Sequence, residues 1–400
     1  MTAGMMEGFP PAPQSQATLA NWRLAPFNSW AFHHVREIIP SADIPHDPDG
    51  VRALKAAPQD LARLAVPMAD GKSTTFSQFL ASSSTDGIVI LHKGAVVFEQ
   101  YGNGMTVRSP HILMSVSKSM LGLVAGVLAG QGVLDVERPV TGYVPEVAET
   151  AYAGATVRHL LDMRTGVVFD ENYLATSGPI IEYRKSTGWN PLAPGEAPSD
   201  LRSFYRHLGE TDRPHGGRFH YISVNTDLLG WVVERAAGRR FANLMSELIW
   251  QPMGAADSAY ITVDRLGAPR CAGGMCMTTR DLARVGQLIL ERGARGTKQI
   301  IPESWIADIL EAGDPEAWRA STFVEYFPGL DMHYRAKWYV ERGRTPLLSG
   351  LGIHGQNLFI DPANQIVIAK FSSQGPPLDV ELIDVTRAAV NAVRKALSGD

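Results

Sequence analysis

Ser115 and Lys118, three residues apart, are the pair in this chain whose types and spacing best suit covalent chemistry. They precede an apolar run, residues 120–128, that predicts a helix, and residues three apart on a helix lie within hydrogen-bonding reach. A serine hydroxyl is a weak nucleophile and needs a base; burial or a neighbouring cation can lower the pKa of a lysine enough to provide one. The same two residues would also fit a structural serine at a helix start beside a solvated lysine. The pattern alone therefore does not show that the pair is catalytic.

The composition excludes several classes of function. The 400 residues are 45% hydrophobic, and 41 acidic against 37 basic side chains give a formal net charge of −4. This length predicts two domains or one domain with a large insertion. No basic surplus indicates nucleic acid or an anionic membrane as a partner. Two cysteines, Cys271 and Cys276, are too few for a disulfide framework or a thiolate metal site. The sequence therefore implies no metal and no organic cofactor.

The N-terminal residues bear on cellular location. Residues 1–18 have neither the basic region nor the apolar core of a signal peptide, which predicts a cytoplasmic protein. The longest apolar stretch, residues 120–134, is interrupted by glycines and is too short for a membrane span, so a buried helix is expected there. The sequence sets no oligomeric state and leaves a homodimer open.

The elements before and after Ser115 differ in character. Residues 1–60 are rich in proline and predict a loop-like arm whose aromatic side chains, Trp22 and Phe32 among them, pack on the body. Residues 87–92 and 95–101 predict a β-hairpin. Mostly helical segments follow the apolar run, and we expect them at residues 157–163, 200–208, 225–237, 241–250 and 279–291.

Strand patterns return near the C-terminus. We expect strands at residues 333–341, 353–360 and 365–372, and a final amphipathic helix at 379–397. Strands at both ends with helices between them predict an α/β fold, in which both termini build one antiparallel sheet flanked by helices. The expected division is a discontinuous sheet domain, residues 1–112 and 262–400, and a mostly helical inserted domain, residues 113–261, with Ser115 at the seam.

One motif in the sequence resembles a nucleotide-binding site but lacks the structural context for it. Residues 350–355 match the dinucleotide fingerprint G-x-G-x-x-G. The residues that follow are strand-like, whereas that fingerprint needs a helix N-terminus to hold the pyrophosphate. Nucleotide binding is therefore not expected at this segment.

Three motifs in a characteristic order make the chain resemble the penicillin-recognising serine hydrolases. This group includes class C β-lactamases, D-alanyl-D-alanine peptidases, family VIII carboxylesterases and the 6-aminohexanoate-dimer (nylon-oligomer) hydrolases, the branch that it resembles most. The first motif is Ser115-Val116-Ser117-Lys118. The second is a Y-x-N-type box, for which Tyr221 stands seven residues before Leu228, with Ser223 at the usual asparagine position. The resemblance implies a β-lactamase/transpeptidase-like fold.

The third motif of the family, a K-x-G-type box on a strand, is degenerate here. It matches either Gly350-Leu351-Gly352 followed by Ile353, or His354-Gly355-Gln356. The box needs glycine in its third place so that substrate can approach, with the next N–H pointing at the developing oxyanion. The first register meets this need and predicts an oxyanion hole made by the backbone N–H groups of Ser115 and Ile353. Gly350 then replaces the usual cation, which argues against penicillins as substrates.

The resemblance implies roles for further residues. Ser115 would be acylated, with Lys118 and Tyr221 acting as a coupled pair on its proton; which of the two is the formal base stays open. Candidate substrate contacts are Tyr173, Ser223, Arg184 and His354. Arg184 stands where some nylon-oligomer hydrolases have an acidic residue that meets the substrate amine, so efficient cleavage of the nylon dimer is doubtful.

The leading hypothesis from the sequence is a serine hydrolase that cleaves small amides or esters through an acyl-enzyme on Ser115. A small molecule is then the expected partner, with no nucleic acid and no membrane. Two alternatives remain: a catalytically silent binding protein on the same fold, and an enzyme of the DD-peptidase or β-lactamase type.

Overall fold

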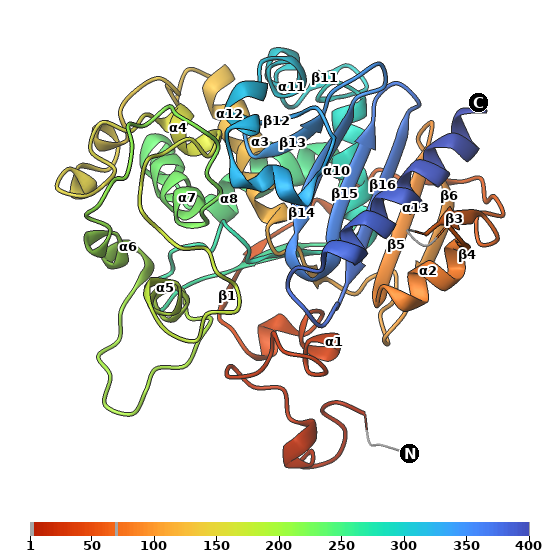
Figure 1. Ribbon diagram of the computed structural model, residues 1–400, viewed down its shortest axis with the longest axis horizontal. Coiled ribbons are helices and arrows are strands. Elements are labelled where there is room, and N and C mark those ends of the chain that lie inside the picture. The colour runs from red at the N-terminus through yellow and green to blue at the C-terminus, as the bar shows by residue number, and fades with distance from the viewer. Residues whose placement is uncertain (1–3, 69–70, 400) are drawn as a thin grey trace.

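A computed structural model describes residues 4–68 and 71–399. Its main feature is an eight-stranded sheet in the order β12-β13-β14-β15-β16-β5-β6-β2, antiparallel except for the β2–β6 pair (Figure 1). Its strands are, in that order, Met332–Arg335, Trp338–Glu341, Leu347–Gly352, Gln356–Asp361, Ile366–Ser372, Thr85–His92, Ala95–Tyr101 and Lys55–Ala56. Residues from both ends of the chain thus form one sheet, as the sequence predicts.

Smaller sheets complete the strand inventory. A four-stranded sheet has the order β1-β8-β9-β7, and its strands are Ser41–Ile44, Ala259–Thr262, Met275–Met277 and His111–Ile112. Two short pairs join β3 (Ala65–Pro67) to β4 (Ser73–Thr75) and β10 (Ala294–Arg295) to β11 (Lys298–Gln299). The four-stranded sheet contains residues from both sides of the predicted seam. The division into two domains at residues 112/113 and 261/262 stays a prediction.

Helices pack on both faces of the large sheet, and further helices come from the part of the chain between Ser115 and β8. Those before the inserted region are α1 (Asn28–Ala31) and α2 (Phe76–Ser82). Those from Ser115 to β8 are α3 (Val116–Gly130), α4 (Val157–Leu161), α5 (Pro179–Ser186), α6 (Leu201–Phe204), α7 (Val224–Ala237), α8 (Phe241–Met245) and α9 (Gln251–Met253). The remainder are α10 (Thr279–Leu290), α11 (Glu303–Glu311), α12 (Pro315–Arg319) and α13 (Val380–Ser398). No helix among the described residues is long and apolar enough to cross a membrane.

Strand β5 shows why the sheet is covered on both faces. Its alternate residues point to opposite faces, and residues 88–91 are all apolar. Val89 and Leu91 join the core that contains α3 and α10, whereas Ile88 and Ile90 join the core that contains α2 and α13. A continuous apolar run is typical of a strand buried on both faces.

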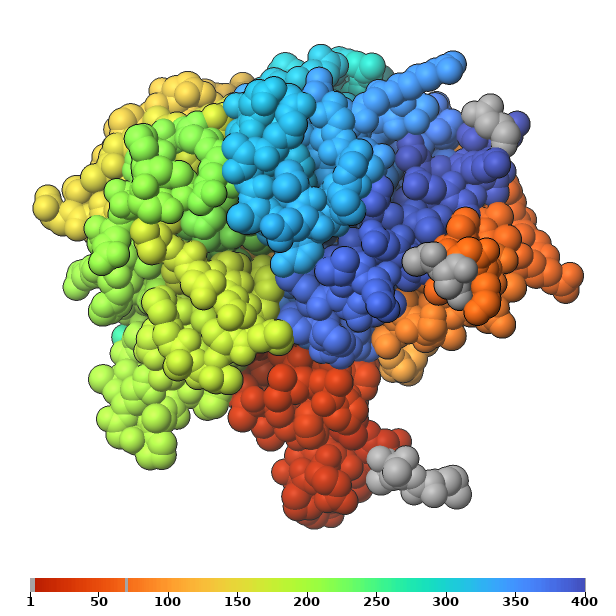
Figure 2. Space-filling model, viewed as in Figure 1, coloured from red at the N-terminus to blue at the C-terminus, as the bar shows by residue number. Residues whose placement is uncertain are grey.

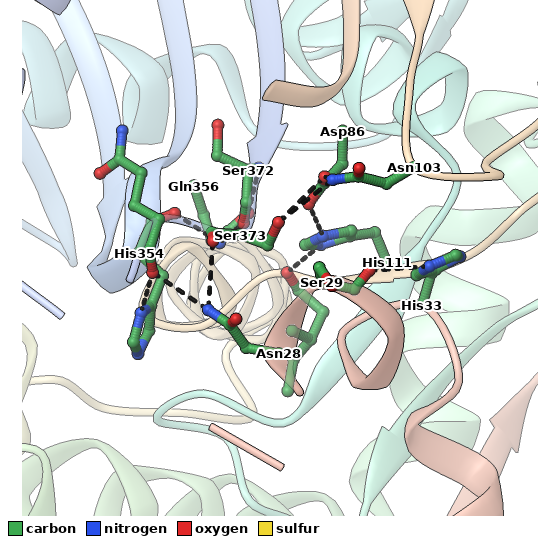
Figure 3. A network of polar contacts seen from close by, with 12 residues as sticks. Asn28, Ser29, His33, Asp86, Asn103, His111, His354, Gln356, Ser372 and Ser373 are labelled. Atoms are coloured by element: carbon green, nitrogen blue, oxygen red, sulfur yellow. Dashed lines mark hydrogen bonds and ion pairs between the residues drawn. The ribbon is translucent and has the colours of Figure 1, made fainter. Parts of the chain in front are cut away.

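The N-terminal arm is anchored to the body, as its aromatic residues predict. In Figure 2 the arm adjoins the segment around residues 165–195 and the C-terminal part of the chain. Trp22 is buried and its indole N–H donates to the Trp189 carbonyl at 3.2 Å. Asn28 donates to the carbonyls of Ser373 and Gln374 at the end of β16 (Figure 3). The arm therefore bridges the helical region and the sheet.

Two predicted strands differ from the structure. The strand expected at residues 333–341 is two strands, β12 and β13, because Ala336 and Lys337 both have positive φ and form a hairpin turn without glycine. The strand expected at 353–360 begins only at Gln356, because Ile353–Gly355 is a 3-10 turn in which His354 has a φ of 62°. The preceding residues, Leu347–Gly352, form β14, which the sequence pattern missed.

Packing of α10 on the sheet generates a stability prediction. A Cβ added to Gly286 would lie 2.4 Å from Val367 Cγ1 on β16, a buried contact that cannot move aside. Gly286→Ala is expected to lower the free energy of unfolding by about 1–3 kcal/mol through overpacking. Urea-induced unfolding measures this change.

A matched glycine serves as the control. Gly209 has no neighbouring atom within 4 Å of an added Cβ and no positive φ. Gly209→Ala should leave the unfolding midpoint unchanged or slightly raised. Equal midpoints for the two variants would contradict the packing described here.

Candidate active site

Ser115 lies at the N-cap of α3, in direct contact with Lys118. The Lys118 Nζ donates to Ser115 Oγ at 2.7 Å and to the Ala272 carbonyl at 2.8 Å. The first contact is the one that their three-residue spacing predicts. The second orients the amine from the opposite side, so Nζ is fixed beside the serine hydroxyl.

The surroundings of Lys118 change its ionisation. The side chain is 1% exposed, and burial lowers its pKa to about 7. Glu171 raises this pKa and Arg270 lowers it, both by smaller amounts than burial. A substantial fraction of Lys118 is therefore neutral near pH 7, where it can accept a proton.

Tyr221 completes the contact around the serine. Its hydroxyl lies in polar contact with the side chains of Ser115 and Tyr339. Its ring lies 4.8 Å from Lys118 Nζ. Burial, reinforced by Glu171, raises the pKa of Tyr221. The phenol is thus protonated near neutral pH and placed to relay a proton.

The end of β14 reaches Ser115 at Gly352. A Cβ on Gly352 would lie 2.8 Å from the Leu113 carbonyl and 3.0 Å from the Ser115 nitrogen, so only glycine allows this approach. The next residue, Ile353, follows the last ladder pair, Gly352–Gln356. Within the described ranges, neither the Ser115 nor the Ile353 N–H donates to another residue. This arrangement agrees with the register in which these two groups form the oxyanion hole.

The turn that presents Ile353 is held by Gln356. Its side-chain amide donates to the carbonyls of His354 at 3.2 Å and Ser372 at 2.6 Å, and its oxygen accepts from the Ser372 N–H at 3.1 Å (Figure 3). The turn is therefore tied to β16, which limits how far Ile353 can move from Ser115.

His354 does not lie where a substrate contact requires. Its ring is 3% exposed, its Nδ1 hydrogen-bonds to the Gln374 carbonyl at 2.7 Å, and it packs on Phe32 of the arm. It lines neither of the spaces that meet at Ser115. The position of His354 does not support its expected role as a substrate contact: the ring is buried between the arm and the turn, where it bonds to the Gln374 carbonyl (Figure 3).

Two spaces meet at Ser115. The larger, the apolar cleft, holds about 1020 Å³ of non-protein space, open to solvent, and Tyr221 and Tyr339 line it. Its apolar wall includes Phe323, Phe327, Leu330, Met332, Leu351 and Phe359. The smaller, the polar chamber, holds about 390 Å³ and is lined by Arg23, Glu171, Arg184, Ser223, Arg270 and Ala272. Ser115, Tyr173 and Ile353 border both.

Three of the predicted contacts meet around Glu171, which the sequence pattern missed. The Glu171 carboxylate accepts from the Ser223 N–H at 2.9 Å, from the Ser223 hydroxyl at 2.5 Å and from the Tyr173 hydroxyl. Arg184 donates to the Tyr173 carbonyl at 3.1 Å. Tyr173, Ser223 and Arg184 thus lie together beside Ser115. Their roles as substrate contacts remain predictions.

Asp227 is a second residue that sequence reasoning missed. It is buried, accepts from the Ala272 N–H at 2.7 Å and is paired with Arg270. The Ala272 carbonyl in turn accepts from Lys118. Asp227 therefore positions the peptide that holds Lys118. The sequence offered one signal: Asp227 directly precedes the apolar residues Leu228 and Leu229, and an acid in a buried segment needs a partner.

No group of three or more His, Cys, Asp or Glu side chains suited to a metal ion occurs among the residues that the structure describes.

The fold and this site define a serine hydrolase. Residues 73–392 match the Beta-lactamase family profile, so the chain belongs to the β-lactamase family. It is 36% identical to a 6-aminohexanoate-dimer hydrolase of Paenarthrobacter ureafaciens over 371 residues, 92% of this chain and 91% of that one. Over 156 residues, 38% of each chain, it is 27% identical to the esterase EstB of Burkholderia gladioli.

Solved structures agree with this family. A Bacillus anthracis protein assigned as a 6-aminohexanoate-dimer hydrolase superposes with a TM-score of 0.88 at 27% identity, covering 97% of this chain and 99% of its own. A family VIII carboxylesterase shares the fold, with a TM-score of 0.58 at 17% identity over 79% of this chain and 95% of its own. The predicted family and fold are thereby confirmed, as is a serine hydrolase of amide or ester bonds.

The ionisation of Lys118 generates a prediction about pH. A fluorophosphonate should label Ser115, and the labelling rate should rise with pH through about 7 and then level off, because the neutral lysine accepts the serine proton. Intact-protein mass spectrometry over a pH series measures this rate.

The control for labelling is Ser115→Ala, which should gain no mass. A rate that falls with rising pH, or labelling that persists in Ser115→Ala, would contradict the assignment of Lys118 and Ser115.

Proposed function

We propose that this protein hydrolyses small amides or esters through an acyl-enzyme on Ser115. The observation that carries the proposal is the joint contact of Lys118 and Tyr221 with Ser115, beside the Ser115 and Ile353 N–H groups, which donate to no other described residue. Nucleophile, base and oxyanion donors are the parts that acyl transfer requires.

Lys118 acts as the base in the first step. Its pKa near 7 leaves neutral amine available, whereas Tyr221, with a raised pKa, holds its proton. Ser115 Oγ attacks the substrate carbonyl as its proton passes to Lys118 Nζ. The negative charge on the carbonyl oxygen is stabilised by the N–H groups of Ser115 and Ile353.

Tyr221 then donates a proton to the leaving group. The bond between the acyl carbon and the leaving nitrogen or oxygen breaks, and the phenol regains its proton from Lys118 through the contacts at Ser115. Water then attacks the ester on Ser115. Lys118 and Tyr221 take the proton of that water and return a proton to Ser115 Oγ as it leaves. The acid is released and the serine hydroxyl is restored.

The substrate has an apolar portion beside the scissile bond. The apolar cleft starts at Ser115 and runs along aromatic and aliphatic side chains, which suits an alkyl or aryl group. The 6-aminohexanoate-dimer hydrolase relative supports a linear amide and EstB supports an ester. Gly350 packs against Ser119 and Val116 of α3 and provides no cation, so β-lactams bearing a carboxylate are poor substrates.

A substrate panel tests the proposal. Purified protein should hydrolyse p-nitrophenyl butyrate, and Ser115→Ala should lower kcat by about 10⁴-fold or more because the nucleophile is lost. Tyr221→Phe should lower kcat by about 10²–10⁴-fold, the range of general acid–base catalysis. A linear alkyl amide and a β-lactam in the same panel separate amidase from β-lactamase activity.

The control variant is Ser77→Ala, an exposed serine of α2, which should retain the wild-type rate. Equal rates in wild type and Ser115→Ala would overturn the proposal and favour a binding protein on this fold.

A further inference from the structure

The polar chamber carries more positive charge than its own residues balance. Three guanidinium groups line it, from Arg23 of the arm, Arg184 of α5 and Arg270. Arg270 is paired with buried Asp227. Across residues 4–68 and 71–399, neither Arg23 nor Arg184 forms an ion pair within 4.0 Å. Neither guanidinium therefore has a carboxylate within ion-pair distance, and the charge of Arg184 is favoured by Glu171 from farther away.

The hydrogen bonds of these two side chains leave donors free. Arg23 donates from Nη2 to Asn190 Oδ1 at 2.5 Å, and its buried Nε has no partner. Arg184, 7% exposed, donates from Nη2 to the Tyr173 carbonyl at 3.1 Å. Each guanidinium has five N–H donors, so several remain for a ligand. A buried, unpaired donor is unfavourable unless something fills the site.

The acid of the chamber does not balance them. Glu171 is the acidic side chain in its lining; it acts to raise the pKa of Arg184 and so offsets one of the two guanidinium charges, which leaves one positive charge in excess. Burial, with repulsion from Arg184 and Arg270, lowers the pKa of Arg23 to about 9. Arg23 is still charged at neutral pH, and the guanidinium groups are close enough to repel one another. An anion between Arg23 and Arg184 would offset that repulsion.

The position of Tyr221 decides which part of a substrate enters the chamber. Tyr221 lines the apolar cleft and does not line the chamber. Because Tyr221 donates to the leaving group, the leaving group lies on the cleft side. The acyl part then extends past Ser115 and Ile353 into the chamber.

We propose that the polar chamber binds a carboxylate carried by the acyl part of the substrate, through the guanidinium groups of Arg23 and Arg184. This inference rests on the proposed function. The substrate class is a monoester or monoamide of a short dicarboxylic acid, whose other end is an apolar alcohol or amine. Guanidinium and carboxylate match in charge and in planar donor geometry.

The reaction balances without any additional reactant. The ester or amide bond breaks, the acyl carbon bonds to Ser115 Oγ, and the leaving alcohol or amine takes the proton that Tyr221 delivers. Water then cleaves the acyl-enzyme and releases the dicarboxylic acid. The distal carboxylate stays unchanged in the chamber throughout.

Three matched substrates test the inference. They are the p-nitrophenyl esters of adipic acid, of its monomethyl ester and of 6-aminohexanoic acid, with distal groups that are anionic, neutral and cationic. Wild type should show a kcat/KM for the anionic ester at least about 10-fold above the neutral one. Arg23→Gln and Arg184→Gln should each reduce this anionic-to-neutral ratio by roughly 10- to 100-fold, mostly through KM, as expected for hydrogen bonds to a charged group.

Arg206→Gln is the matched control, since Arg206 is exposed and does not line the chamber; its ratio should equal that of wild type. Ser115-dependent hydrolysis with no anionic preference, or with a ratio unaffected by both chamber variants, would overturn the inference and leave the proposed function intact.

A binding measurement distinguishes failure of the proposed hydrolase function from failure of the proposed carboxylate site. Ser115→Ala should bind adipate in calorimetry, but not hexane-1,6-diol, and Arg184→Gln in the Ser115→Ala background should lose that binding. If no ester is hydrolysed in a Ser115-dependent way but adipate binds through Arg184, the proposed function fails and the anion site stands. Absence of adipate binding together with hydrolysis of all three esters at equal rates contradicts the site alone.

Discussion

The buried amine of Lys118 is the constraint on which the rest of the site depends. Removing an ammonium from water is unfavourable by several kcal/mol, so the fold must surround it with groups that tolerate either protonation state. The Ala272 carbonyl and the Ser115 hydroxyl do so. The pair of Asp227 and Arg270 fixes the Ala272 peptide and brings one charge of each sign into the neighbourhood. The buried polar groups of α7 and of the Ala272 loop thus help to position one atom, the Nζ of Lys118 on α3.

Local pattern predicted the elements that hold the nucleophile, and it failed where backbone geometry depends on distant contacts. The patterns of residues 87–92, 95–101, 120–128 and 379–397 were sufficient to predict β5, β6, α3 and α13, with small differences at their ends. Strand β14 was missed because Gly350 and Gly352 weaken a strand pattern. Both are glycines because the strand end approaches α3 and Ser115 closely, a contact that the sequence alone does not reveal.

For the candidate site too, local patterns were predictable and distant contacts were not. Ser115, Lys118 and Tyr221 were predicted as catalytic residues because their spacings are local or follow a motif. The register that places Ile353 at the oxyanion hole was predicted because it requires a preceding glycine. Glu171 and Arg23 could not be found in this way. Glu171 matters because its loop folds onto Ser223, and Arg23 matters because the arm crosses to Trp189. Arg23 also lies outside residues 73–392, the part of the chain that defines the family.

The pairing of β16 with β5 has a consequence for the timing of synthesis. Ser115 and the hairpin β5–β6 leave the ribosome well before β14, the Ile353 turn and β16. Domains fold as units once their contacting segments are available, and long-range strand pairing is slow. A nascent chain therefore carries Ser115 before Ile353, the residue proposed as its second oxyanion donor, and before β16. The proposed acyl transfer therefore becomes possible only after β16 has been made.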